Sequence, residues 1–594
     1  MKNKLFKYSV ALTALLVLGA CNDEFLERYP LDRISNETFW KTENDLLVYN
    51  NGLYNLARND NDIPILMAHD EGFNSHKYSV WMLDEYADNI APRHARHLPY
   101  QQLRAGKHIV PNSASGDGQW YGYKGWNFIR AINIGLENYY TGGLPTATVD
   151  KYAAEARLFR GWFYADKVSK FGDVQWIDKE LKPDSEELYG PRNPRKEVMD
   201  KVLEDLNFAS QKLPANWGDG GAPGRLNRWA ALLVKARICL FEGTWRKYHG
   251  LGDHDKWLQE AAAAASELIE KGPYKLYSTG KPDEDYNAYH RVLDLTGNPE
   301  VMYWRKYRLG VFTNHVQSYH KDYNGGATKN MVEDYLCTDG LPINLSPLYK
   351  GDATIEDVFE NRDPRLRQTI LHPLDKDKYT FGLGDKLAYP RLPGMEGGHK
   401  AETGYHIIKV YNAADQIGKA FNTAEAPGII LRLAEALLIL AEAKAELGTI
   451  TQADIDMTIN KLRDRVGMPH LDMANVPVDP RYTADGISPL LAEIRRERRV
   501  ELFMEGFRYD DLRRWKQGKK LLQPDLGMRY DDVAKARYTK AVVKTTMVDG
   551  VPYIDVYQGT DWANPVFDES KHYLWPIPLN DLAQNPNLKQ NPGW

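Results

Sequence analysis

The strongest constraint on the fold is a series of amphipathic stretches with the periodicity of an α-helix. Apolar residues recur three and four positions apart, as they do on the buried face of a helix, and turns containing Pro or Gly separate the stretches. The stretches span residues 35–59, 120–140, 151–172, 194–214, 227–249, 254–272 and 426–448. Helices of this length in close succession predict antiparallel hairpins that pack on one another. Their spacing is too irregular to indicate a sequence repeat.

The long stretches between and after these helices have a different composition. Residues 274–424 and 468–594 are rich in Pro, Gly, Asn, Asp and Tyr, and they allow short strands at most, for example in VMYW from residue 301. Loops of this length in a compact protein are usually functional or wrapped around a scaffold. We therefore expect a mostly α fold with a large loop-rich part.

The N-terminal residues have the pattern of a secretory signal peptide. Three lysines precede an apolar run over residues 10–18, which is too short to span a membrane. The sequence LGAC, which ends at Cys21, resembles a bacterial lipobox, in which the cysteine becomes the lipidated first residue of the mature chain. We expect residues 1–20 to be removed and the protein to be membrane-anchored through lipid on Cys21. The alternative is an ordinary signal peptide followed by an unrelated cysteine.

An arginine-rich block at residues 495–519 could be taken for a nucleic-acid-binding segment. The whole chain, however, has 76 Lys and Arg against 81 Asp and Glu, whereas nucleic-acid binders normally carry a basic excess. On a helix, Arg498 would face Glu501 and Glu505 would face Arg508, at the spacing of surface ion pairs. We expect a charged helix docked by its apolar face, and no nucleic-acid partner.

The sequence lacks the short motifs of several common catalytic and metal sites. No His is followed by Glu, and there is no P-loop, no Cys-x-x-Cys pair and no Gly-x-Ser-x-Gly elbow. Pro64 spoils the register of the preceding Asn/Asp run as a calcium loop. We expect no cofactor and no metal. A disulfide between Cys239 and Cys337 remains an open alternative at this stage.

Aromatic residues with polar neighbours are concentrated in two places. A sugar presents apolar C–H faces and a rim of hydroxyl groups, so flat rings beside hydrogen-bonding side chains are its physical complement. Core packing is the competing explanation for each ring, and for Trp304 it is at least as well supported. The first group contains Tyr78, Trp81, Tyr86 and Tyr100 with Arg93, His94 and His97; the second contains Tyr303, Trp304, Tyr307, Phe312, Tyr319 and Tyr323.

Acidic residues in LDEYADN, from residue 83, offer the carboxyl pair that a glycosidase needs. Such an enzyme uses two carboxyl groups about 5–10 Å apart, and Asp84, Glu85 and Asp88 are candidates. Because the chain has 81 acidic residues, a solvated acidic loop is the better interpretation.

Eight stretches, in their order along the chain, resemble the SusD/RagB outer-membrane lipoproteins of Bacteroidetes. The acidic NDE after Cys21 also looks like a surface-export signal of such lipoproteins. The stretches are EARLFRGWFYADKVSKFGDV (155–174), GRLNRWAALLVKARICLFEG (224–243), ATKNMVEDYLCTDGLPI (327–343), NRDPRLRQTI (361–370), IILRLAEALLILAEAKAELG (429–448), INKLRDRVGMP (459–469), IRRERRVELFMEGFRYDDLRRWKQGK (494–519) and LWPIPLNDLAQNPNLKQNPGW (574–594).

This resemblance implies a mostly α, SusD-like fold with tetratricopeptide-like hairpins and few short strands. The mature chain would be 21–594, with an N-terminal part at about 21–225 and a C-terminal SusD/RagB part at about 274–594 that share one helical scaffold. In that scaffold the arginine block would form structural ion pairs with other helices.

The resemblance also implies a non-catalytic protein on the outside of the outer membrane. It would capture a glycan and pass it to a SusC-like TonB-dependent transporter, on which it sits as a lid. Binding surfaces of this family are aromatic arcs on loops, and we expect the two aromatic groups to face each other across one shallow groove. The candidate ligand-binding residues are Tyr78, Trp81, Arg93, His94, Tyr100, Tyr307, Tyr319 and Tyr323.

Three alternatives remain open. A RagB-like lid that binds peptides or another nutrient would need a deeper, enclosed cavity shared with the transporter. A surface glycosidase would use the carboxylates at residues 84–88. A purely structural partner that gates the transporter would have buried aromatic groups and no soluble ligand.

Overall fold

The computed structural model describes residues 39–594 apart from ten gaps, and side chains at 55–59 and 80–82 are also outside the description. The start of the first predicted helical stretch, residues 35–38, therefore lies outside the described residues. The gaps are 60–79, 92–101, 103–104, 114–122, 219–223, 315, 317–324, 376–389, 397–399 and 413–422.

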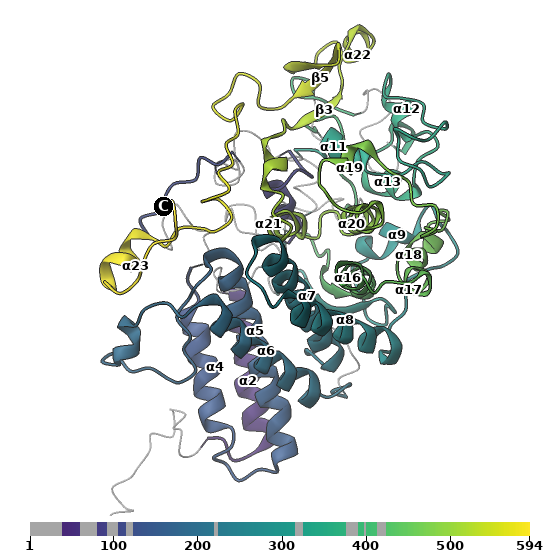
Figure 1. Cartoon of the computed structure of the whole chain (residues 1–594). Coiled ribbons are helices and arrows are strands. Elements are labelled where there is room, and N and C mark those ends of the chain that lie inside the picture. The colour runs from purple at the N-terminus through teal and green to yellow at the C-terminus, as the bar shows by residue number, and fades with distance from the viewer. Residues whose placement is uncertain are drawn as a thin grey trace, which may run out of the picture.

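Four long helices form the N-terminal part, as the hydrophobic periodicity predicts. They are α2 (Glu43–Asn59), α4 (Trp126–Asn138), α5 (Thr146–Phe171) and α6 (Arg195–Lys212), and α5 packs against the other three (Figure 1). Gly172 ends α5 with a φ of 71°, a backbone conformation that favours glycine.

The next hairpin, α7 (Arg228–His249) with α8 (His254–Lys271), continues this layer. The Asn227 side chain caps α7 by accepting the N–H of Ala230 at 2.9 Å. Gly243 lets the two helices approach closely, because a Cβ there would lie 2.9 Å from the Leu258 side chain. The expected hairpin arrangement is therefore present.

The C-terminal half joins the same scaffold through α16 (Leu433–Glu446), which packs on α7, α8 and α20 (Pro489–Glu501) (Figure 1). The prediction of one helix over 426–448 is wrong at its start. Residues Gly428–Arg432 form strand β2, which pairs antiparallel with β1 (Val301–Arg305). A short apolar run fits a buried strand as well as a helix, and the distant partner strand decides between them.

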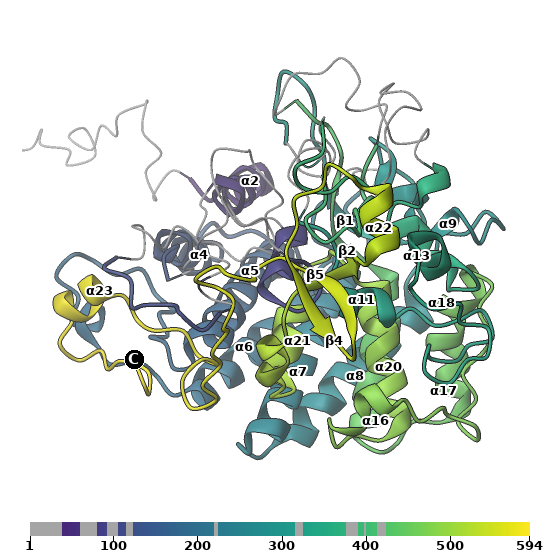
Figure 2. The ribbon, with the colours of Figure 1, turned by 90° about the horizontal axis from the view of Figure 1, so that it is seen from above.

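The described part of the loop-rich remainder also contains a three-stranded sheet and many short helices. β3 (Leu526–Arg529), β5 (Val551–Asp555) and β4 (Thr545–Val548) form an antiparallel sheet in that order. Figures 1 and 2 place α23 and the C-terminus at one edge and α17 and α18 at the opposite edge. The short helices are η4 (Val80–Tyr86), η5 (Glu186–Tyr189), α9 (Asp285–Ala288), η6 (Tyr289–Arg291), α11 (Lys329–Glu333), α12 (Ile355–Phe359), α13 (Pro364–Thr369), η7 (Pro373–Asp375), α17 (Gln452–Met457), α18 (Ile459–Arg465), α19 (Pro480–Thr483), α21 (Arg508–Arg514), η8 (Gly518–Leu522), α22 (Asp532–Arg537) and α23 (Leu579–Gln584).

The arginines of the arginine-rich block lie inside the protein and not on its surface. Arg498 binds Asp511 at 2.9 Å and is 4% exposed, and Arg508 binds Asp88 at 2.7 Å. The expected structural role of the block is confirmed, but the expected surface pairs Arg498–Glu501 and Glu505–Arg508 are wrong. Both glutamates face inward and bind basic residues from other elements.

Glu501 is the centre of a buried ionic network. Its carboxylate, fully shielded from solvent, accepts hydrogen bonds from Arg365, Arg432 and Arg465 at 3.2, 2.8 and 2.6 Å. Burial disfavours its charge, but the three arginines outweigh burial and hold the pKa of Glu501 well below its usual range. This network joins α20 to α13, β2 and α18.

Two smaller expectations concern cysteines and membrane segments. Cys239 and Cys337 are both buried and free, so the disulfide alternative is wrong. Within the part of the chain that the structure describes, no helix is long and apolar enough to cross a membrane.

Candidate functional site

Several of the predicted binding residues fall in two stretches, the gaps at 92–101 and 317–324. The chain enters the first gap and leaves the second at one place on the molecule. Ile90 and Ala327 form an antiparallel bridge, and the Ala91 N–H donates to the Gly326 carbonyl at 3.0 Å. The gap at 92–101 starts directly after Ala91, and the gap at 317–324 ends just before residue 325. The Thr328 hydroxyl adds a bond to the Asp88 carbonyl at 2.6 Å. The two stretches therefore share a hydrogen-bonded base.

Most of the candidate ligand-binding side chains lie outside the described residues. Trp81 belongs to η4 by its backbone, but its side chain is not among those described. The remaining six outside the description are Tyr78, Arg93, His94, Tyr100, Tyr319 and Tyr323. Their facing arrangement across a groove therefore stays a prediction.

Tyr307 is the one candidate whose side chain is described, and it is 2% exposed. Its ring stacks on Phe312 with centroids 5.3 Å apart, and the Arg305 guanidinium lies 5.6 Å from its centroid. A tight turn at residues 308–312 holds these rings together, because Arg308 and Phe312 exchange backbone hydrogen bonds. Trp304 is 4% exposed within a buried cluster, as core packing predicts.

The carboxylates at residues 84–88 are buried, so the expectation of a solvated acidic loop is wrong. Asp84 accepts the backbone N–H of Met504, and burial raises the pKa of Asp84 to about 7 despite that hydrogen bond. Burial likewise raises the pKa of Glu85 well above its usual range. At Asp88, burial is outweighed by Arg499 and Arg508, which lower its pKa. Asp84 and Asp88 fasten this segment to the arginine block.

A small cavity with an aromatic lining lies close to the chain that follows the gap at 103–104, and it was not predicted from the sequence. Trp562 and Tyr557 line a cavity of about 20 Å³ together with Gln523 and Asp555. Ala105, which follows the gap at 103–104, also lines it, and its carbonyl accepts the N–H of Val566 at 2.8 Å. The only sequence clue was a tryptophan in the Pro- and Gly-containing segment YQGTDWANP.

Clusters of metal-ligating side chains are absent among the described residues. No group of three or more His, Cys, Asp or Glu side chains there could hold a metal ion. Several buried carboxylates are instead paired with arginines, among them Asp88, Glu442 and Glu501.

Comparisons with known proteins agree with this architecture. The SusD family matches residues 293–594, and a family described as "Starch-binding associating with outer membrane" matches residues 65–240. A SusD-like protein P2 of Formosa agariphila is 24% identical over 99% of this chain and 100% of its own length. A SusD-like protein of Bacteroides ovatus is 23% identical over 100% of this chain and 98% of its own.

Solved structures show the same fold. A SusD-like carbohydrate-binding protein from Bacteroides fragilis superposes with a TM-score of 0.71 at 21% identity, covering 93% of this chain and all of its own. A laminarin-binding SusD-like protein gives a TM-score of 0.56 at 19% identity, with 93% and 100% coverage. With the family match over half of the sequence and the helical scaffold described above, the chain belongs to the SusD family.

Proposed function

We propose that this protein is a non-catalytic, lipid-anchored glycan-capture protein on the outer face of the outer membrane. It binds oligosaccharide or polysaccharide on its aromatic loops and passes it to a SusC-like TonB-dependent transporter. Family membership supports the class of ligand, since relatives are named as carbohydrate-binding and laminarin-binding proteins. Membrane association is supported by the family description and by the lipobox at Cys21.

The shared base of the two aromatic stretches is the observation that carries the proposal. Because Ala91 and Gly326 are hydrogen-bonded, rings carried near the start of one stretch and the end of the other can contact one ligand. Sugar rings stack on aromatic faces, and a few polar groups fix their orientation. Trp81, Tyr319 and Tyr323 are the proposed stacking residues, with Arg93 and His94 as polar partners; Tyr78 and Tyr100 extend the surface.

Tyr307 has a different role in this proposal. Its ring is covered by Phe312 and Arg305, so it supports the turn at residues 308–312 beside the second stretch. Direct stacking of a sugar on Tyr307 would require this packing to open. Substitution of Tyr307 is therefore expected to act through the local backbone.

The test is isothermal titration of the purified protein against plant, host and microbial oligosaccharides. We expect one glycan class to bind and Trp81→Ala and Tyr323→Ala each to weaken binding by about tenfold, as loss of a stacking ring does. Tyr189→Ala is the matched control, because Tyr189 is a 53% exposed tyrosine on η5. Binding that only Tyr189→Ala weakened, or no glycan binding at all, would contradict the proposal.

The alternatives have separate readouts. Release of new reducing ends from a bound polysaccharide would indicate a glycosidase, although Asp84, Glu85 and Asp88 are buried and Asp88 is bound by Arg508. Titration with peptides in place of glycans would identify a RagB-like peptide lid. A protein that binds neither but forms a complex with a transporter would be a purely structural partner.

A further inference from the structure

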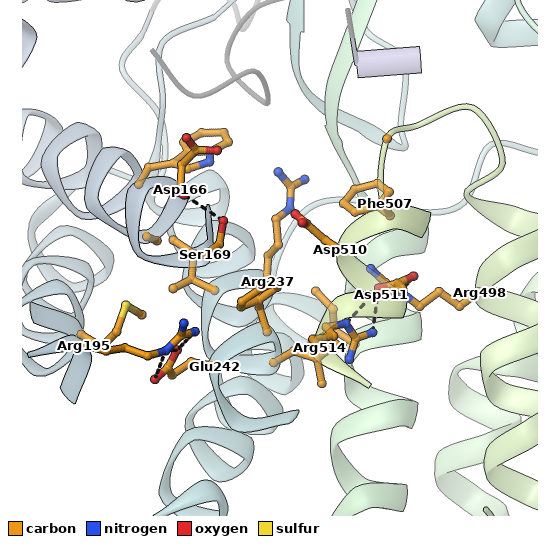
Figure 3. Close-up of a pocket in the computed structure, with 18 residues that line it drawn as sticks. Asp166, Ser169, Arg195, Arg237, Glu242, Arg498, Phe507, Asp510, Asp511 and Arg514 are labelled. Carbon is orange, nitrogen blue, oxygen red and sulfur yellow. Dashed lines mark hydrogen bonds and ion pairs between the residues drawn. The ribbon is translucent and has the colours of Figure 1, made fainter. Parts of the chain in front are cut away.

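A cavity between the N-terminal helices and the arginine block contains donors that the protein does not satisfy. It has a volume of about 70 Å³ and lies between α5, α6 and α7 on one side and α16, α20 and α21 on the other (Figure 3). Most of its exposed lining is apolar, with Phe507, Phe241 and Ile238 among the residues that form it. The cavity is distinct from the proposed glycan-binding loops.

Two of the arginines that line the cavity have all their nitrogens bonded. Arg195 uses its three nitrogens on Glu242 and the Val168 carbonyl. Arg514 binds Asp511 and Glu442 in the same way. These two guanidinium groups are therefore structural.

The other two lining arginines each keep one terminal nitrogen unbonded. Arg237 uses Nε and Nη2 on Glu435, and Arg498 uses Nε on Asp511. Nη1 of each is buried and has no hydrogen-bond partner among the described residues. Arg237 and Arg498 are 8% and 4% exposed, so solvent at the protein surface does not satisfy these donors.

A third unsatisfied donor comes from the same cavity wall. Trp162 is 1% exposed, and its Nε1 is buried with no partner in the described part of the chain. The Arg237 guanidinium lies 5.7 Å from the Trp162 ring centroid and 5.0 Å from that of Phe507, while Arg498 lies 5.2 Å from Phe507. Figure 3 shows Arg237 extending from α7 into the space beside Phe507 and Asp510. The two guanidinium groups therefore lie beside the Phe507 ring, and that of Arg237 also lies beside the Trp162 ring.

The carboxylates at the cavity are already engaged elsewhere. Asp166 binds Lys170 at 2.8 Å, and Asp510 binds Arg513 at 2.8 Å. Neither carboxylate accepts a hydrogen bond from Nη1 of Arg237 or Nη1 of Arg498. A buried donor without an acceptor destabilises a protein, so such a cavity favours an occupant that brings acceptors.

We propose that this cavity binds a small organic carboxylate. The carboxylate head accepts hydrogen bonds from Nη1 of Arg237 and Arg498 and from Nε1 of Trp162, since guanidinium donors pair best with carboxylates. The apolar body packs against Phe507 and Phe241. A water molecule satisfies donors but leaves the apolar wall without contacts, and an inorganic oxyanion has no apolar part to place there.

The test compares butyrate with butyramide, which has a similar shape and no charge, by titration calorimetry on the purified protein at constant ionic strength. Inorganic phosphate is the third probe. We expect saturable binding of butyrate and an increase in Tm with its concentration. Butyramide and phosphate are expected to bind at least tenfold more weakly or not at all.

Two variants locate the site without breaking an ion pair. Trp162→Phe removes the indole donor while it keeps an aromatic ring at this position, and it is expected to weaken butyrate binding by about tenfold. Ala165→Leu adds volume at a lining position that carries no charge and is expected to abolish binding while the circular dichroism spectrum is kept. Leu188→Ala, at a 38% exposed position on η5, is the control that leaves binding unchanged.

Four outcomes would overturn the inference. Equal binding of butyrate and butyramide would show that the charge is not recognised. Binding of phosphate alone would indicate an inorganic anion site. No binding of any probe would mean that water fills the cavity. Unchanged butyrate binding in folded Ala165→Leu would place its site elsewhere.

Discussion

Replacing Glu501 with Gln should destabilise the protein strongly, although the two side chains have nearly the same shape. The Glu501 carboxylate is fully buried and bound by Arg365, Arg432 and Arg465. An amide keeps one acceptor oxygen but removes the negative charge that those arginines share. Leaving buried charges uncompensated costs about 3–5 kcal/mol, which is a large part of the 5–15 kcal/mol by which proteins are typically stable.

The matched control is Glu356→Gln, which removes the same charge at the surface. Glu356 pairs with Arg537 at 2.7 Å, and the two side chains are 40% and 36% exposed. Exposed pairs contribute about 0–1 kcal/mol. Urea unfolding followed by circular dichroism should therefore show a large fall in the midpoint for Glu501→Gln and little change for Glu356→Gln.

Acid provides a second readout of the same interaction. The folded pKa of Glu501 is held well below the ordinary value of 4.5 by the arginines, against the effect of burial. Its contribution to stability is therefore present above pH 4.5 and is lost as the pH falls towards the folded pKa. The difference in urea midpoint between wild type and Glu501→Gln should therefore decrease below that pH. Equal midpoints for the two glutamine variants at pH 7 would refute the reasoning.

Three further predictions follow from buried groups. Arg499→Glu would place a carboxylate beside Asp88 and Asp334 and should lower the free energy of unfolding by more than about 3 kcal/mol; an unchanged urea midpoint would contradict this. Burial raises the pKa of Asp84 from the ordinary 3.8 to about 7, so the protonated side chain contributes stability fully below pH 3.8, and this contribution is lost as the pH rises from there through 7. Asp84→Asn should gain stability relative to wild type over that range in thermal melts, and a constant difference between pH 5 and 8 would count against it. Burial also raises the pKa of the Cys239 thiol, so iodoacetamide should label Cys239 only in denaturant, as mass spectrometry can show.

The long helices could be predicted from sequence because their determinants are local. The periodicity of α5, α7 and α8 and the caps at Asn227 and Gly172 depend on neighbouring residues alone. Strand β2 could not be separated from α16 by pattern, because its partner β1 lies far away in the sequence. Local chemistry therefore sufficed for the helical scaffold and not for strand pairing.

The charged interior was the least predictable part of the fold. Arg508 and Asp88 are separated by 420 positions yet bind each other at 2.7 Å. Spacing along one helix suggested i,i+3 surface pairs, whereas the real partners come from the segment just after η4 and from α13, β2 and α18. Three-dimensional proximity of this kind leaves no periodic trace in a single sequence. For the same reason the cavity donors at Arg237 and Trp162 gave no signal.

The candidate binding surface was predictable only as a pair of aromatic-rich stretches. Residue type made Trp81 and Tyr307 equally good candidates for ligand binding, but the Tyr307 ring is stacked on Phe312 and buried. The hydrogen-bonded base at Ala91 and Gly326 is what brings the stretches together, and backbone pairing between them could not be inferred from composition.

The most direct test of the proposed capture surface is a double-variant cycle on the bound glycan. Titration calorimetry would compare wild type, Trp81→Ala, Tyr319→Ala and the double variant against the same oligosaccharide. If both residues contact one ligand in one groove, each single variant should weaken binding, and the double variant should reduce the affinity below measurement. If either substitution left the affinity unchanged, the two stretches would not form a single binding surface.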